Sequence, residues 1–254
     1  MPNTQVTLVQ IDNYGPWTVT PEPRREVDLQ TLQSRLYADL SQQFGSRGGY
    51  VFFTRFDNMI AVTNGIDESV HRQVQTSIRN RYPVTTSFGI GVDPSPAVAL
   101  EAATEAIQDA GSAQDAERRE VLSGSILDES ADDDLTIAHF DVNDATERLT
   151  DRLDAFATFA HIERGYAELM AHFYEAHEGL AFFVGGDNVI AVCPDLDRAA
   201  FEETIAHVDE AAGVDLKVGV GGGATAESAG MAAKHALERC RENGHDVDID
   251  DSAQ

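Results

Sequence analysis

One pattern occurs twice in this chain, as GGYVFFTRFDNMIAVTNG at residues 48–65 and as EGLAFFVGGDNVIAVCPD at residues 178–195. In each copy an apolar run leads into an Asp-Asn pair and a second apolar run follows, which is typical of two strands joined by a hairpin. Asp57 and Asn58 of the first copy align with Asp187 and Asn188 of the second, an offset of 130 residues. The chain is therefore expected to be a tandem repeat.

The same register extends over most of both halves. VTLVQID, which ends at Asp12, matches LTIAHFD, which ends at Asp141, and glycines 89 and 91 match glycines 219 and 221. Each half then has a strand, an amphipathic helix, the hairpin, a second helix, a glycine-paired strand and an alanine-rich helix. A helix between strands that are not a hairpin requires a crossover, so each half is expected to be a split β-α-β unit of the ferredoxin-like kind.

This organisation predicts an α+β protein of two tandem ferredoxin-like domains, each an antiparallel sheet with helices on one face. We expect the domains at residues 1–112 and 135–243. Between them, 113–134 reads as an acidic, partly helical linker because it has charge runs and little apolar periodicity. Residues 244–254 read as a frayed acidic tail.

Composition narrows the class of protein. The 44 acidic and 18 basic residues give a formal net charge of -26, which would repel a nucleic-acid backbone. Apolar runs are too short to cross a bilayer and the first residues lack a signal-peptide pattern, so we expect a cytoplasmic protein without a membrane or nucleic-acid partner. High acidity and only two lysines suit a cytoplasm of molar salt, where charge repulsion is screened.

A zinc site is not indicated. The two cysteines, Cys193 and Cys240, are isolated. His161, His172 and His177 share one helical stretch, but five-residue spacing puts the last two on different faces. They are interpreted as solvated surface residues.

Two pairs of aspartates are candidate metal ligands. Asp12 and Asp57 are 45 residues apart, and Asp141 and Asp187 are 46 apart. In a ferredoxin-like sheet the first strand neighbours the hairpin, so both carboxylates of a pair fall at one edge. Mg²⁺ prefers such oxygen ligands and keeps positions for water and phosphate. The alternative is that these aspartates satisfy backbone donors at strand ends and turns, which duplication would also copy.

Glycines and lysines of the second half suggest a phosphate site. Gly185 and Gly186, just before Asp187 and Asn188, would let the backbone approach a ligand and form an anion-binding nest. Lys217 on a strand and Lys234 on a helix would suit a triphosphate. The alternatives are an ordinary hairpin turn and two surface lysines. The first half has Arg55 and Phe56 in place of the two glycines, so the two sites cannot be equivalent.

The largest departure from the repeat is DNYGPWTVTPEPRRE at residues 12–26. It contains three prolines, the only tryptophan and an arginine pair. Such a rigid loop could bind a base or phosphates through Asn13, Trp17, Arg24 and Arg25. The alternative is a rigid connector anchored by the tryptophan.

Several of these motifs resemble those of known enzyme families. FFVGGDN after a strand ending in aspartate resembles the palm domain of diguanylate cyclases. More closely, VQIDNYGPWTVTPEPRRE, LQSRLYADL, FTRFDN, NGID, NRYP and GSAQD resemble archaeal GTP cyclohydrolase III over both halves. The resemblance implies opening of the GTP imidazole ring with the formyl group kept, release of inorganic phosphate, dependence on Mg²⁺, stimulation by a monovalent cation such as K⁺, and a homo-oligomer.

Three functions stay open at this point. The first is a GTP ring-opening hydrolase with Mg²⁺ on either aspartate pair or on both, and with Arg24, Arg25, Arg55 and Lys217 on phosphates or base. The second is a nucleotidyl cyclase of the diguanylate type, which Asn188 disfavours because those enzymes have a carboxylate there. The third is a non-catalytic GTP-binding regulator.

Overall fold

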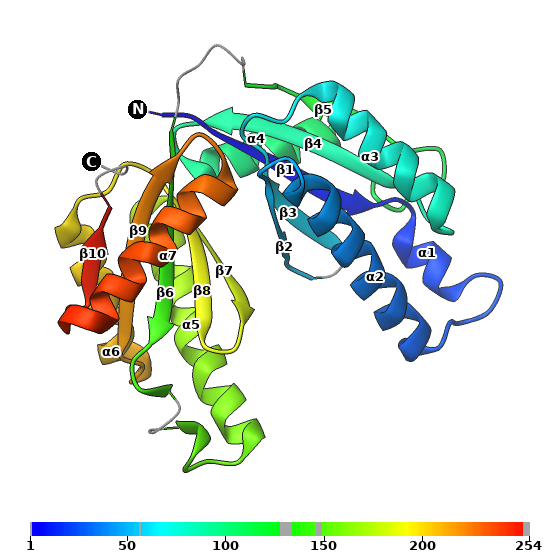
Figure 1. Cartoon of the computed structure of the whole chain (residues 1–254). Helices are drawn as coiled ribbons and strands as arrows, with labels where there is room; N and C mark the ends of the chain where they lie inside the picture. Colours follow the sequence, from blue (N-terminus) through cyan, green and yellow to red (C-terminus); the bar gives the residue numbers. More distant parts are fainter. Residues whose placement is uncertain (1, 56, 128–133, 146–148, 251–254) are drawn as a thin grey trace. The chain divides into compact units, whose positions relative to one another are not determined.

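The computed structural model describes residues 2–55, 57–127, 134–145 and 149–250. The chain divides into two compact units, one containing strands β1 to β5 and the other β6 to β10. The elements of the first unit are β1 (Thr4–Ile11), α1 (Tyr14–Val19), α2 (Glu26–Gly45), β2 (Tyr50–Phe53), β3 (Asn58–Val62), α3 (Glu68–Arg81), β4 (Thr86–Asp93), α4 (Pro96–Gln108) and β5 (Leu122–Gly124) (Figure 1). Those of the second are β6 (Leu135–Val142), α5 (Ala155–His177), β7 (Leu180–Gly185), β8 (Asn188–Cys193), α6 (Arg198–Ala212), β9 (Leu216–Gly223), α7 (Ala226–Asn243) and β10 (Val247–Ile249).

Both units have the predicted ferredoxin-like core. The strand order is β2-β3-β1-β4-β5 in the first sheet and β10-β9-β6-β8-β7 in the second. The strand that ends in aspartate lies between the hairpin and the glycine-paired strand and runs antiparallel to both. This order confirms the α+β class and brings the end of β6 beside both the β7–β8 turn and the start of β9.

One face of each sheet is covered by two helices. Helix α2 buries Leu32, Leu36, Leu40 and Phe44, which recur every fourth residue and form one apolar stripe. They pack with α3 and with strand residues such as Val9 and Phe88 into the first core. In the second unit, α5 and α6 build the corresponding core around Phe140, Phe173 and Phe201.

The closing helix of each half covers the opposite face, which corrects the expectation of helices on one face only. A Cβ added at Gly89 would lie 1.9 Å from the backbone oxygen of Ala103 on α4, and one at Gly219 would lie 2.1 Å from the backbone nitrogen of Leu237 on α7. The paired glycines therefore let a third helix approach the sheet backbone, so helices lie on both faces.

Two segments expected to be irregular form edge strands. Residues 113–121 form turns rather than a helix, and β5 then pairs in parallel with β4. Residues 128–133 of the expected linker lie outside the described residues. The tail is also not frayed throughout, since β10 pairs in parallel with β9 and buries Val247. Each sheet is therefore mixed, with a fifth, parallel strand.

Within the described ranges, none of the helices combines the length and apolar character needed to cross a membrane.

Candidate functional site

In the second unit, three strands bring polar side chains to one end of the sheet. Asp141, near the end of β6, pairs in register with Asn188 on β8 and with Lys217 on β9. His139 lies two residues earlier on β6 and therefore points to the same face as Asp141. Because His139 pairs with Gly219, which contacts α7, this is the face that α7 covers. The site is thus built from β6, the β7–β8 turn, β9 and α7.

The two aspartates of this half lie close together among cations. Burial and the neighbouring Asp141 charge both raise the pKa of Asp187, while Arg241 and Lys217 partly offset the shift. Arg241, on α7, makes an ion pair of 2.8 Å with Asp141. The Asp141 side chain is buried, but that of Arg241 is 40% exposed. The Arg241 guanidinium can therefore swing away from Asp141 into solvent.

A hydrogen-bond chain runs from His139 to Asp187. His139 Nε2 lies 2.9 Å from Asn188 Oδ1, and Asn188 Nδ2 donates to Asp187 Oδ1 at 3.0 Å. Because an amide oxygen only accepts, His139 must carry its proton on Nε2. Burial lowers the pKa of His139, which keeps the ring neutral. The chain fixes the orientation of the Asn188 amide and, through it, of the Asp187 carboxylate.

His139 and Asn188 line a cavity of about 440 Å³, and Asp187 adjoins it through its hydrogen bond with Asn188. Its walls come from β6, the β7–β8 hairpin and α7, and consist of His139, Val184, Gly185, Asn188, Lys234, Leu237, Glu238 and Arg241. At the turn, Gly185 and Gly186 have φ values of 115° and 68°, which favour glycine. The backbone thus approaches the cavity without side chains at the point where the sequence predicts an anion-binding nest.

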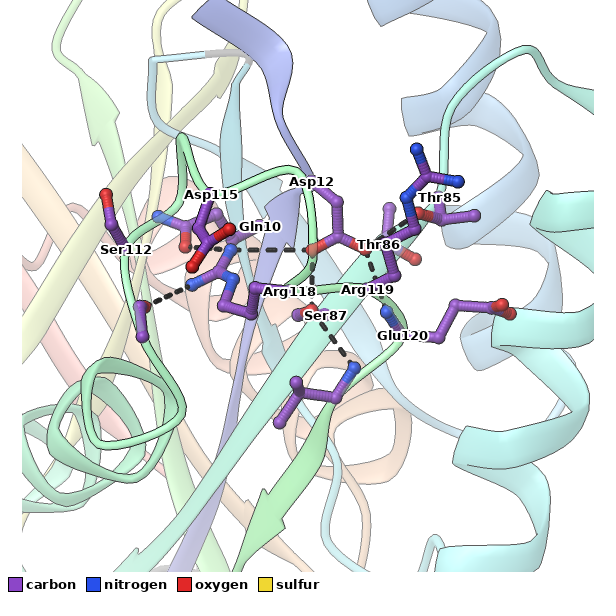
Figure 2. Close-up of polar contacts among 12 residues, drawn as sticks. Gln10, Asp12, Thr85, Thr86, Ser87, Ser112, Asp115, Arg118, Arg119 and Glu120 are labelled. Atoms are coloured by element: carbon purple, nitrogen blue, oxygen red, sulfur yellow. Dashed lines mark hydrogen bonds and ion pairs between the residues drawn. The ribbon is translucent and has the colours of Figure 1, made fainter.

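The equivalent aspartate of the first unit is enclosed by protein donors (Figure 2). Asp12 Oδ1 accepts hydrogen bonds from Ser87 Oγ at 2.5 Å and from Arg118 Nη2 at 3.4 Å. Its Oδ2 accepts from Thr85 Oγ1 at 2.8 Å and from the backbone N–H of Glu120 at 2.9 Å. Both carboxylate oxygens are therefore engaged.

Arg118 supplies the positive charge at this position. Its side chain and that of Asp12 are each 2% exposed, and its Nη2 also donates to Gln10 Oε1 at 2.6 Å. Nη1 donates to the backbone oxygen of Gly111. The turns between α4 and β5 thus place a guanidinium over the end of β1, where it neutralises the aspartate without any ligand.

The other aspartate of the first half has a separate partner. Asp57 Oδ2 accepts from Arg55 Nη2 at 2.7 Å, and this arginine is largely exposed. Arg55, predicted to bind phosphate or base, is thus engaged in a local ion pair within the hairpin.

The proline-arginine loop borders a smaller cavity of about 220 Å³. Asn13, which has a left-handed φ of 51°, and Trp17 line it together with Asp12, Tyr82, Pro83, Val84, Thr85 and Arg119. Arg24 lies over the Trp17 ring at 3.8 Å. Arg25 lies outside this cavity's lining and pairs with Asp28 at the exposed start of α2. Of the four predicted loop residues, Asn13 and Trp17 thus line this cavity, and Arg24 and Arg25 do not.

The prediction that His172 and His177 lie on different faces of their helix is wrong. The ring centroids of His172 and His177 are 5.5 Å apart, and His172 stacks on His207 of α6 at 4.1 Å. The end of α5 packs on α6, which the spacing on one helix alone does not reveal.

The structure thus brings together the predicted residues of the second half: Asp141, Gly185, Gly186, Asp187, Asn188, Lys217 and Lys234. It adds His139, Glu238 and Arg241, which sequence reasoning missed. His139 could have been found from the strand period of two, and Arg241 from its position two helical turns after Lys234. Arg118 gave no signal, because it lies in the segment interpreted as a linker.

Comparison with known proteins identifies the family. The family model described as GTP cyclohydrolase III matches residues 6–250. The chain belongs to the GTP cyclohydrolase III family. It is 65% identical to GTP cyclohydrolase III of Natronomonas pharaonis over 98% of this chain and 99% of that protein. It is also 65% identical to GTP cyclohydrolase III 1 of Halobacterium salinarum over the full length of both, and 46% identical to the Methanococcus vannielii member over 96% and 91%. The resemblance seen in the sequence is confirmed.

Solved structures similar to this chain include two GGDEF domains. That of PA1120 from Pseudomonas aeruginosa is 14% identical, with a TM-score of 0.39, and the match covers 46% of this chain and 83% of that domain. That of DgcB from Caulobacter crescentus, in complex with c-di-GMP, is 14% identical with the same TM-score, and the match covers 46% and 77%.

Proposed function

We propose that this chain opens the imidazole ring of GTP by hydrolysis, keeps the formyl group on the pyrimidine product and releases inorganic phosphate, at the site of the second unit. Membership of the GTP cyclohydrolase III family supports the substrate and the reaction. A cytoplasm of high salt, stimulation by K⁺ and a homo-oligomer belong to the same proposal.

One observation carries the choice of site. Asp141 and Asp187 are bonded to Arg241 and Asn188, two residues that line a cavity of about 440 Å³ together with Lys234, whereas both oxygens of Asp12 are engaged by protein donors. In a chain of formal net charge -26, a cavity edged by cations is suited to an anionic ligand.

The donor set fits Mg²⁺. Asp141 and Asp187 offer hard carboxylate oxygens. Burial and the Asp141 charge raise the pKa of Asp187, and a bound dication would offset both effects. Asp141 and Asp187 would hold the ion, which would supply positive charge for the nucleotide's phosphates and lower the pKa of an attacking water. The exposed Arg241 would give up Asp141 to such a cation and turn toward the nucleotide's phosphates.

The chain's own residues have distinct roles in this proposal. Lys217 and Lys234 bind phosphate oxygens as compact point charges. The N–H groups of Gly185 and Gly186 bind an anionic oxygen of the substrate. His139 acts as a positioning residue, because its hydrogen bond to Asn188 holds the Asp187 carboxylate in place.

The decisive experiment incubates purified protein with GTP and Mg²⁺ in molar potassium chloride and identifies products by mass and ultraviolet spectrum. Ring opening yields a formylaminopyrimidine and inorganic phosphate. An intact guanine in a cyclic or linked dinucleotide would instead establish a nucleotidyl cyclase, and unaltered bound GTP would establish a regulator.

The same assay with variants assigns the site. Asp187→Asn is expected to lower kcat/KM by about 10³-fold, because an amide is a poor metal ligand. Asp12→Asn should retain activity within about tenfold per folded molecule. If Asp12→Asn abolishes turnover in folded protein while Asp187→Asn does not, the working site lies in the first half.

A further inference from the structure

Helix α5 exposes an apolar face. Between residues 155 and 176, eleven residues are exposed, and only Arg164 and Glu175 among them are charged. Phe156 is 76% exposed and Tyr174 is 53% exposed. Large apolar side chains gathered on one surface of a soluble domain mark an interaction site more often than chance exposure does.

The equivalent helix of the first half is a built-in control. Helix α2 has nine exposed residues between 26 and 45, and only Val27 and Ala38 among them are apolar. Both helices cover the same face of the same kind of sheet, and both bury their inner stripe. The apolar exterior of α5 is therefore not required by the fold.

The outer residues of α5 follow a heptad-like spacing. They occur at steps of four, three, four, three and four residues, and we call this set the α5 face: Phe156, Ala160, Glu163, Ala167, Met170 and Tyr174. Phe159 adds to it, since its ring lies 6.3 Å from that of Phe156. Such spacing keeps one stripe turned toward a neighbouring helix, so the α5 face suits a helical partner.

The pattern is also self-complementary. In an antiparallel pair of α5 helices centred at Gly165, Phe156 faces Tyr174 of the second copy, Ala160 faces Met170, and Glu163 faces Ala167. Large residues meet at both ends and small residues lie near the middle. A two-fold interface requires this kind of match, because the same patch supplies both sides.

The charges on α5 are compatible with a second copy. Between 155 and 176 the charged residues are Glu163, Arg164, Glu168 and Glu175, a net charge of -2 for each copy, whose repulsion molar salt would screen. In the antiparallel arrangement Arg164 lies about 3 Å along the axis from the level of Glu168 of the second copy, on the same flank. Unlike charges therefore border the apolar stripe.

We infer that two copies of this chain associate through the α5 face, with their α5 helices antiparallel. This inference specifies the homo-oligomer named in the proposed function. It does not depend on the ring-opening reaction, so either can fail without the other.

Sedimentation of the full chain in molar potassium chloride, over a range of concentrations, tests the inference. Wild-type protein should sediment as a dimer or a multiple of it. The double substitution Phe156→Glu/Tyr174→Glu should raise the dissociation constant of that contact at least tenfold. Val27→Glu, at an exposed apolar position of α2, is the matched control and should leave it unchanged. A monomer at every concentration, or a folded double variant that associates like wild type, would overturn the inference.

Cross-linking tests the orientation and does not depend on a destabilising change. The native Cys193 and Cys240 are buried, so introduced thiols would react alone. Ala160→Cys/Met170→Cys should form an intermolecular disulfide on mild oxidation, because these positions face each other across the antiparallel pair. Phe156→Cys alone should not. Cross-linking of Phe156→Cys without the double variant would indicate parallel helices and contradict the inference.

Discussion

Asp12 and Asp141 occupy the same position in two copies of one fold, and each is held by an arginine, but the arginines come from different places. Arg118 belongs to the turns after α4 and is buried with its aspartate. Arg241 belongs to the end of α7 and is partly in solvent. In the first unit, the protein itself supplies every partner of the Asp12 carboxylate. In the second unit, the partner of Asp141 can move away and leave that carboxylate to a ligand. Duplication preserved the carboxylate, and the neighbouring cation determines whether it is structural or available to a ligand.

Removal of the two arginines should give the largest contrast in stability. Arg118→Met leaves the buried Asp12 carboxylate without its counter-charge, which typically costs about 3–5 kcal/mol. Arg241→Met also removes the partner of a buried carboxylate, but this arginine is partly exposed and Lys217 lies in register with Asp141, so the cost should be smaller, about 1–2 kcal/mol. Urea unfolding of both variants measures the difference. Equal losses would show that Arg118 is not the counter-charge that the structure indicates.

The lysines of the second half should affect substrate binding more than folding. Lys234→Gln removes a charge from the cavity wall and is expected to raise KM for GTP by roughly 10- to 100-fold, the cost of one charge-assisted contact to phosphate. Arg25→Gln, at the exposed start of α2, is the matched loss of charge and should change KM less than threefold, roughly within the range of surface substitutions. Steady-state kinetics at saturating Mg²⁺ measures KM for both variants. A similar KM for the two would contradict a phosphate contact by Lys234.

Protonation of the buried His71 should contribute to loss of stability of the first unit in acid. His71 is fully buried, with Nε2 2.9 Å from Thr7 Oγ1 and Nδ1 2.7 Å from the backbone oxygen of Asp67. Burial lowers the pKa of His71, so the folded state binds its proton less readily than the unfolded state. Its stabilisation is present above the ordinary histidine pKa and is lost as pH falls through the range below it.

The replacement His71→Gln should make stability less dependent on pH in that range. Thermal unfolding of both proteins between about pH 7.5 and pH 5 measures the slopes. Because other histidines with lowered pKa lie in the second unit, among them His139 and His172, the slope should decrease without vanishing. An unchanged slope would mean that His71 does not stay neutral in the folded state.

The smallest expected effect is a gain in thermal stability on replacing Asp187. A raised carboxyl pKa means that folding disfavours the ionised form, so at neutral pH Asp187 destabilises the metal-free protein. Asp187→Asn should therefore raise Tm slightly, by about 2 °C, while activity is lost. Asp57→Asn lacks this repulsion and serves as the control. A lower Tm for Asp187→Asn without Mg²⁺ would contradict the raised pKa of Asp187, which burial and the Asp141 charge cause.

Much of the fold follows from the repeat, because strand and helix periods are local properties of the chain. The glycines at 89, 91, 219 and 221 were visible, but their consequence was not, since only the assembled sheet shows that a third helix lies on them. The edge strands β5 and β10 have three residues each and too little apolar periodicity to be recognised.

The site was predicted where its residues alternate along a strand or flank a turn, as Asp141 and Asp187 do. It was missed where a side chain arrives from a distant segment. Arg118 reaches Asp12 across 106 residues, and nothing in GSAQDAERRE distinguishes it from its charged neighbours. Such contacts determine whether a carboxylate is bonded within the protein or available to a ligand. The sequence alone therefore could not assign the site to one half.

The pairing of β10 with β9 affects how the protein can be engineered. Truncation after Gly244 would strip the flank of the second sheet and leave the main-chain groups of Val218 and Val220 unpaired on that side, open to intermolecular β-pairing. An affinity tag on this chain therefore belongs beyond residue 250, where the last strand still shields the sheet from aggregation.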